Sequence, residues 1–178
     1  MVNPKLLRAV PLIVMLLLAI MLAFGLLHSH SPREGERPIG YAVSPFDIPS
    51  LSGQRFSPAT WHGRVALLNA FASWCESCTA EHDMVMKIAH TGKVAIYGLA
   101  WRDKPEKVTQ WISVYGNPYQ SIGVDEYGKS TVALALTGVP ETFVFDKNGA
   151  IAYHYAGILP NDIVDGVILP LVEKLNAE

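Results

Sequence analysis

Two cysteines, Cys75 and Cys78, are the only ones in this 178-residue chain, and two residues separate them. The run 65–72 before them is apolar without Gly or Pro, and 76–90 after them carries apolar residues at helical spacing. A strand that leads into a helix N-terminus places Cys75 where backbone N–H groups favour the thiolate, which is the reactive form of the thiol. Cys78 follows about one helical turn later. Two thiols so placed indicate thiol–disulfide exchange with another protein.

The cysteine count argues against a structural bridge. A disulfide across two residues closes too small a loop to stabilise a fold, and no other cysteine remains to make one. Outside the cytoplasm, free thiols tend to become disulfides. A lone cysteine pair in that environment is therefore better explained by a redox reaction than by a structural role.

The N-terminal segment indicates where that chemistry takes place. Residues 9–27 contain no charge and are long enough to cross a bilayer as a helix. Lys5 and Arg8 precede the run, which puts the N-terminus in the cytoplasm and the rest of the chain outside. A cleaved signal peptide is the alternative, but the cleavage-site match at 23–25 is poor. We expect a transmembrane anchor over 1–29 that remains uncleaved.

The remainder has the composition of one compact domain. Residues 30–43 are polar and rich in Pro and Gly, which is typical of a linker, and 44–178 has the length of a single domain. A net charge of −2 gives no indication of nucleic-acid binding.

Strand and helix patterns alternate along the domain. This alternation predicts an α/β fold with a mixed central sheet flanked by helices. A hairpin turn is expected at 51–54, and Asn148-Gly149 is a second turn signal. The expected strands are 65–72, 94–101, 119–124, 141–145 and 151–156, and the expected helices are 76–90, 105–115, 129–136 and 160–175, the last with Pro170 as a candidate kink.

Four segments together resemble a known family. The chain is similar to the DsbE/CcmG branch of membrane-anchored thioredoxin-like proteins, which act in bacterial cytochrome c maturation. The segments span most of residues 40–175, and they are Leu67-Leu68-Asn69-Ala70-Phe71-Ala72-Ser73-Trp74-Cys75, Ala80-Glu81-His82, Gly116-Asn117-Pro118-Tyr119 and Gly138-Val139-Pro140-Glu141-Thr142-Phe143.

The resemblance implies a thioredoxin-like fold with a central insertion within 103–136. It also implies a cis peptide bond between Val139 and Pro140, facing the cysteines. The extended backbone before Pro140 would then bind a substrate peptide as an added strand. Val139 is thus expected to contact substrate, and Pro140 to belong to the catalytic site.

Position and resemblance together assign the redox roles. Cys75, at the exposed helix start, is expected to attack, and Cys78 to resolve the mixed disulfide, so that the pair cycles through a Cys75–Cys78 disulfide. The family's substrate is the Cys-x-x-Cys-His segment of apocytochrome c, or a partner thiol protein that handles it. Its electrons come from a membrane donor of the DsbD or CcdA type. We expect no cofactor, because the chain has no Gly-x-Gly-x-x-Gly fingerprint.

Acidic residues near the motif are candidates for proton transfer. Thioredoxins carry a buried Asp where this chain has Asn69, so another base is needed, and Glu81 and Asp103 are the two candidates. Glu141 is expected to contact polar groups of the substrate. Trp74 is expected to contact substrate and to shield the thiols, and a purely packing role is the alternative.

Glu76 replaces the Pro that many family members carry after the first cysteine. Its charge would disfavour a neighbouring thiolate and make the pair more reducing. The other explanation is that an acidic residue simply suits the first turn of a helix.

Two other classes of function remain open from the sequence. Cys75, Cys78 and a histidine such as His82 could hold copper(I), as in a metallochaperone of thioredoxin fold. A zinc site would need a second cysteine pair, which is absent. A peroxidase of the thioredoxin superfamily is the third class. We expect no resident metal.

Overall fold

The computed structural model describes residues 11, 14–23, 40 and 42–178, and the chain divides into two units, Met1–Arg33 and Glu34–Glu178. In the first unit, residues 14–23 are helical. Among the described residues, no helix combines the length and the apolar character needed to cross a membrane. The expected span 9–27 lies partly outside those residues, as does most of the expected linker.

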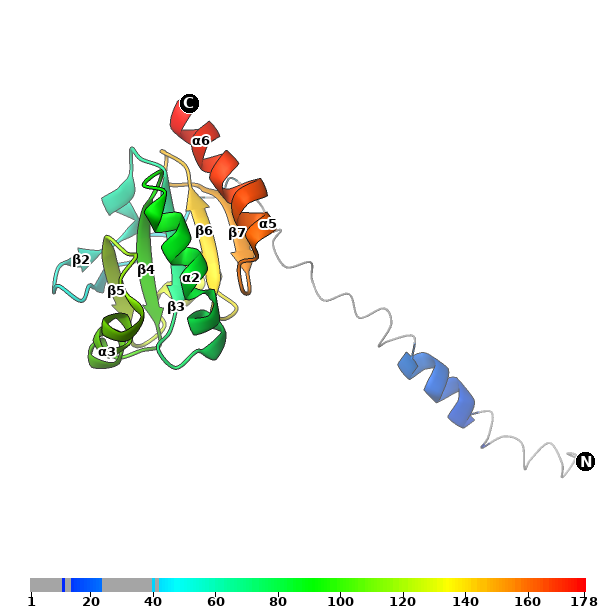
Figure 1. Cartoon of the computed structure of the whole chain (residues 1–178). Helices are drawn as coiled ribbons and strands as arrows, with labels where there is room; N and C mark the ends of the chain where they lie inside the picture. The colour runs from blue at the N-terminus through cyan, green and yellow to red at the C-terminus, as the bar shows by residue number, and fades with distance from the viewer. Residues whose placement is uncertain (1–10, 12–13, 24–39, 41) are drawn as a thin grey trace, which may run out of the picture. The chain divides into compact units, whose positions relative to one another are not determined.

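The second unit is built on a five-stranded mixed sheet with the order β5-β4-β3-β6-β7 (Figure 1). The strands β3, β4 and β5 run parallel, while β6 is antiparallel to both β3 and β7. Their bounds are β3 Ala66–Phe71, β4 Ala95–Trp101, β5 Ser121–Asp125, β6 Glu141–Phe145 and β7 Ile151–Ala156. This confirms the expected thioredoxin-like α/β fold with a mixed central sheet.

Helices and a hairpin cover the two faces of the sheet. One face packs against α2 (Glu76–His90), α3 (Pro105–Tyr115) and the C-terminal helix. The other face is covered by a hairpin of β1 (Ile48–Pro49) and β2 (Arg55–Phe56), by η1 (Pro58–Trp61) and by α4 (Ser130–Leu134). The expected turn at 51–54 joins β1 to β2. The segment expected to hold the insertion, 103–136, supplies α3, β5 and α4.

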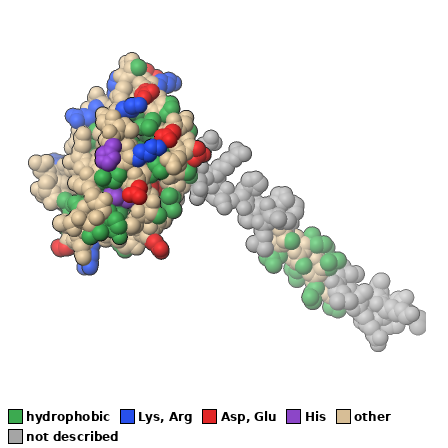
Figure 2. All heavy atoms as spheres, in the orientation of Figure 1, with side chains coloured by type: hydrophobic (Ala, Val, Ile, Leu, Met, Phe, Trp, Pro, Cys, Tyr) green, Lys and Arg blue, Asp and Glu red, His purple; other side chains and the backbone are tan. Residues whose placement is uncertain are grey.

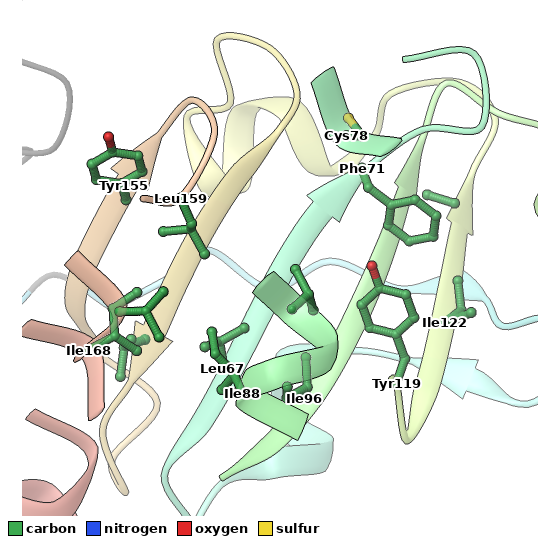
Figure 3. Packing of buried hydrophobic residues seen from close by; sticks show 14 of the residues in the cluster. Leu67, Phe71, Cys78, Ile88, Ile96, Tyr119, Ile122, Tyr155, Leu159 and Ile168 are labelled. Carbon is green, nitrogen blue, oxygen red and sulfur yellow. The ribbon is translucent and has the colours of Figure 1, made fainter. Parts of the chain in front are cut away.

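Strand β3 is buried on both faces, which explains its unbroken apolar sequence. Leu67 and Phe71 belong to the core cluster beneath α2, which Figure 3 shows, whereas Leu68 and Ala70 belong to the cluster on the opposite face. Because side chains alternate along a strand, Asn69 shares the α2 face with Leu67 and Phe71. A polar amide thus points into the core beneath the active-site helix.

The C-terminal helix is less regular than expected. It begins as α5 (Asn161–Ile163), passes through the π-helical turn η2 (Val164–Ile168) and continues as α6 (Leu169–Ala177). Pro170 has no N–H to donate, and the irregular turn ends just before it. The irregularity therefore takes the form of a wide turn ahead of the proline.

The ordered fold also begins earlier than the expected boundary at residue 44. Gly40 N–H donates to Ile151 O at 2.9 Å, and Ala42 forms an isolated bridge with Ala150. The last residues of the expected linker thus pair with the start of β7.

Charged side chains of both signs are interspersed on the face that Figure 2 shows. Lys87 pairs with Asp165 at 2.8 Å and Lys93 with Glu173 at 2.5 Å, joining the α2 region to the C-terminal helix. Exposed pairs of this kind contribute little to stability, on the order of 0–1 kcal/mol each.

Candidate active site

The two cysteines lie at the junction of β3 and α2 and are joined by a disulfide. Cys75 is the N-cap of α2, and its sulfur accepts a hydrogen bond from Cys78 N–H at 3.1 Å. An N-cap is normally an oxygen-bearing side chain, so the sulfur here occupies the position that favours negative charge. Once the disulfide opens, this N–H and the helix dipole stabilise a Cys75 thiolate.

Cys75 is more covered than the sequence leads one to expect. It is 6% exposed, against 3% for Cys78. Its sulfur lies 3.3 Å from Ser77 Oγ and 3.7 Å from Val139 O, and these neighbours shield it in the disulfide form. Cys75 remains the more exposed residue of the pair, by a small margin.

The peptide bond between Val139 and Pro140 is cis, as the resemblance implies. Val139 is half-buried and Pro140 buried. Because Val139 O lies 3.7 Å from Cys75 Sγ, this loop and the sulfur meet at one site, although 64 residues separate them in the chain. The structure therefore brings together Cys75, Cys78, Val139 and Pro140.

Glu81 is buried in the core face of α2, with 1% of its surface exposed. Oε1 accepts a hydrogen bond from Asn69 Nδ2 at 2.8 Å, and Oε2 accepts one from Leu159 N–H at 3.1 Å. Burial raises the pKa of Glu81 to about 7, against the lowering effect of these two hydrogen bonds. A carboxyl group with that pKa, one helical turn beyond Cys78, can exchange a proton at neutral pH.

Asn69 cannot exchange a proton itself, but its amide is hydrogen-bonded to an acid that can. The strand position that holds an acid in thioredoxins holds an amide here, and the acid reaches that amide from the facing helix. Of the two candidate bases, Glu81 is the one in contact with Asn69.

Asp103, the other candidate base, is buried and fully engaged in holding the loop before Cys75. Its carboxylate accepts hydrogen bonds from Ser73 N–H at 2.5 Å, Ser73 Oγ at 3.0 Å and Lys104 N–H at 2.8 Å. These bonds fix the backbone two residues ahead of the attacking sulfur. The geometry favours a positioning role over proton transfer.

Trp74 is 59% exposed beside the disulfide. Its indole N–H donates to Arg102 O at 3.1 Å, and its ring lies 6.4 Å from that of Trp101, centre to centre. The side chain is thus held on the β4 side and presents a large apolar surface to solvent. That surface is available to a bound protein, and the substrate contact of Trp74 stays a prediction.

Glu141 requires a correction. From the sequence we expect it to touch substrate, but it is 1% exposed and its oxygens are occupied. Oε1 accepts hydrogen bonds from Thr137 N–H (2.8 Å), Thr137 Oγ1 (2.5 Å) and Gly138 N–H (3.0 Å), while Oε2 pairs with His154 Nε2 at 2.8 Å. Burial alone would raise its pKa, but hydrogen bonds from His154 and Thr137 bring the pKa below its ordinary value. Glu141 therefore supports the loop before Pro140 from its buried side, through the hydrogen bonds to Thr137 and Gly138.

The metal-binding alternative has no structural support in the described part of the chain. No group of three or more His, Cys, Asp or Glu side chains there has a metal-binding arrangement. His82 is buried, with its ring 4.5 Å from that of Trp111 and close to the backbone of Tyr115 and Gly116. Burial lowers the pKa of His82, so it is a neutral member of an aromatic cluster.

Glu76 is exposed in the first turn of α2. This position is compatible with both explanations that the sequence left open, a charge effect on the thiolate and a favourable interaction with the helix dipole.

Sequence reasoning missed three polar partners of these groups, Tyr119, Thr142 and His154. Tyr119 OH donates to Asn69 Oδ1 at 2.8 Å, and Thr142 Oγ1 accepts from Asn69 Nδ2 at 3.2 Å. His154 supports Glu141 from β7. The sequence signal for Tyr119 and Thr142 was their place within the quoted family segments, whereas His154 gave none.

Comparisons with known proteins agree with this geometry. The Redoxin family matches residues 40–168. The thiol:disulfide interchange protein DsbE of Vibrio cholerae is 34% identical over 178 residues, covering 95% of each chain, and DsbE of Escherichia coli K12 is 34% identical over 179 residues with the same coverage. A secreted thiol-disulfide isomerase from Corynebacterium glutamicum has a similar fold, with a TM-score of 0.66 at 21% identity, over 82% of this chain and 96% of that one.

Proposed function

The chain belongs to the Redoxin family and is a dithiol thiol:disulfide oxidoreductase, and from that premise we propose that it reduces disulfides of apocytochrome c, or of a thiol protein that handles it. The proposal follows the family resemblance in its choice of substrate. Haem attachment requires two reduced thiols, so an oxidising compartment needs a dedicated reductant.

One observation supports the binding of a protein disulfide at this site. Cys75 caps the active-site helix and lies 3.7 Å from the carbonyl of Val139, next to the cis proline. A substrate strand that pairs with the backbone at Val139 would bring its own disulfide against Cys75 Sγ.

The first half of the reaction forms a mixed disulfide. In the reduced protein, the Cys75 thiolate attacks one sulfur of the substrate disulfide. The substrate S–S bond breaks, a Cys75–substrate S–S bond forms, and the other substrate sulfur leaves as a thiolate that takes up a proton.

The second half releases the substrate. Cys78 loses its proton to Glu81 and attacks Cys75 Sγ, so that the mixed disulfide breaks and the Cys75–Cys78 disulfide forms. The second substrate sulfur leaves as a thiolate and takes up a proton, so the substrate is now a dithiol, two electrons richer, and the protein carries the disulfide seen in the structure. Glu81 suits this role because its pKa of about 7 lets it accept a proton at neutral pH and give it up again.

The remaining parts of the proposal concern location and electron supply. The apolar, charge-free run 9–27 supports a single-pass anchor in the bacterial inner membrane, with the redox domain in the periplasm. A membrane thiol donor of the DsbD or CcdA type would return the Cys75–Cys78 disulfide to the dithiol. Nothing in the charge distribution supports a nucleic-acid partner.

A trapping experiment tests the substrate. The full-length Cys78→Ala variant, expressed in its native membrane, keeps the attacking thiol but has no resolving thiol. We expect it to accumulate mixed disulfides with apocytochrome c or another thiol protein of haem attachment, identified by mass spectrometry after non-reducing purification.

The matched control is the Cys75→Ala variant, which keeps one thiol at the same site but should trap nothing. Recovery of unrelated periplasmic proteins alone with Cys78→Ala would contradict the apocytochrome assignment. Equal trapping by the two variants would contradict the roles given to the cysteines.

A further inference from the structure

Tyr119 lies in the core with its hydroxyl near the redox site. It is 6% exposed, and its ring is stacked on that of Phe71, with the centres 5.0 Å apart and the planes 12° from parallel. Figure 3 shows the two rings side by side, with the Tyr119 hydroxyl on the side towards Cys78. The segment before β5 holds it there, since Tyr119 N–H donates to Asn117 Oδ1 at 3.0 Å.

The hydroxyl controls how the amide of Asn69 is oriented. Tyr119 OH donates to Asn69 Oδ1, which leaves the amide Nδ2 to donate on its other side, to Glu81 Oε1 and to Thr142 Oγ1. A side-chain amide has one accepting atom and one donating atom, so fixing the oxygen also fixes the nitrogen. Burial raises the pKa of Tyr119 well above its ordinary value, and the phenol therefore remains a donor.

Which side of the amide faces Glu81 decides which form of the carboxyl group is favoured. An N–H donor stabilises the ionised carboxylate, whereas a carbonyl oxygen would accept a hydrogen bond from the protonated acid and favour that form. Because Glu81 is buried, either choice acts strongly.

We propose that Tyr119 is a positioning residue for the proton-transfer step: its hydroxyl holds the Asn69 amide with its N–H towards Glu81, which keeps the carboxylate able to accept the Cys78 proton. The inference rests on the proposed role of Glu81 as the base, and it adds a residue 38 positions further along the chain to that step.

Tyr119 is a titratable group that interacts electrostatically with Glu81. Once the disulfide opens, the thiol of Cys78 is a second one, one helical turn earlier on α2. From the segment after β7, Glu81 receives only the backbone N–H of Leu159. Glu141 and its partner His154, which stacks on Phe143 at 4.3 Å, belong to the opposite face of the sheet.

The direct test is a titration of the Glu81 carboxyl in the oxidised full-length protein, followed by ¹³C NMR of the side-chain carbonyl carbon. Tyr119→Phe keeps the ring and removes only the hydroxyl. We expect the pKa of Glu81 to rise by about one pH unit, because the Asn69 amide loses the bond that holds its N–H towards the carboxylate. Tyr97→Phe, which removes a hydroxyl from a buried tyrosine of the other core cluster, should leave the pKa unchanged.

A double-mutant cycle separates positioning from a general loosening of the core. Asn69→Ala should itself raise the pKa of Glu81, and adding Tyr119→Phe should then change it no further. An unchanged pKa in Tyr119→Phe, or an equal shift with and without Asn69, would overturn the proposal.

A kinetic arm keeps this inference distinct from the function on which it depends. The rate of mixed-disulfide resolution should rise with pH through the pKa of Glu81, and Tyr119→Phe should move that inflection upwards. If Glu81→Gln resolves mixed disulfides with the wild-type pH profile, Glu81 is not the base, which overturns the step assigned to Tyr119. The titration then still reports whether Tyr119 orients Asn69.

Discussion

Replacing Glu81 with Gln should remove a specific pH dependence of stability. The pKa of Glu81 is raised from 4.5 in the unfolded chain to about 7 in the folded protein, because the carboxyl is buried. Between these two values the folded state holds a proton that the unfolded state has already released. Stability therefore falls as pH rises from about 4.5 and levels off above about 7.

The size of the effect follows from the shift. At about 1.4 kcal/mol per pH unit, a rise from 4.5 to about 7 makes the folded state about 3 kcal/mol less stable at pH 8 than below pH 4.5, from this group alone. Glutamine cannot ionise, so Glu81→Gln lacks this contribution at every pH. The free energy of unfolding of the variant, minus that of the wild type, should increase by about 3 kcal/mol over this range.

Guanidinium unfolding of the oxidised full-length protein, at half-unit steps between pH 4 and about 8, measures this difference. Other titrating groups contribute equally to both proteins, so the difference isolates Glu81. A constant offset between the two curves is expected from altered hydrogen bonding and carries no information. A difference that does not vary with pH would refute the raised pKa, and a decrease with pH would refute the sign of the argument.

Three further variants probe the loop, the exposed tryptophan and the core. Glu141→Gln weakens the support of the Thr137 loop, so KM for a protein disulfide should rise several-fold and stability should fall by about 1–3 kcal/mol, as measured by steady-state reduction and guanidinium unfolding. An unchanged KM would contradict the positioning role. Trp74→Ala removes a largely exposed side chain, so unfolding should change by no more than about 0.5 kcal/mol while KM rises; loss of stability without a change in KM would instead indicate a packing role. Gly123→Ala places a Cβ against the Phe56 ring, and should cost about 1–3 kcal/mol in an unfolding assay; wild-type stability would show that the β1–β2 hairpin shifts freely.

The local features of this protein could be predicted from the sequence because they depend on neighbours in the chain. Helix α2 runs from Glu76 to His90, as the apolar spacing indicates, and α3 begins at Pro105 and ends at Tyr115 before a glycine. The strand–turn–helix around Cys75 is likewise a local pattern. The position of both thiols at a helix N-terminus, and with it the class of reaction, followed from these elements.

The tertiary structure decided which polar groups meet. Strand pairing sets Asn69 opposite Thr142, and α2 lies on the face to which Asn69 points, so Glu81 meets an amide 12 residues back in the chain. The same pairing turns Glu141 to the other face, where it is buried against His154. The sequence around a carboxylate such as Glu81 or Glu141 is the same whether the side chain points to solvent or into the core. A shift of one residue in strand register reverses that direction, and the register is fixed by packing between segments far apart in the chain.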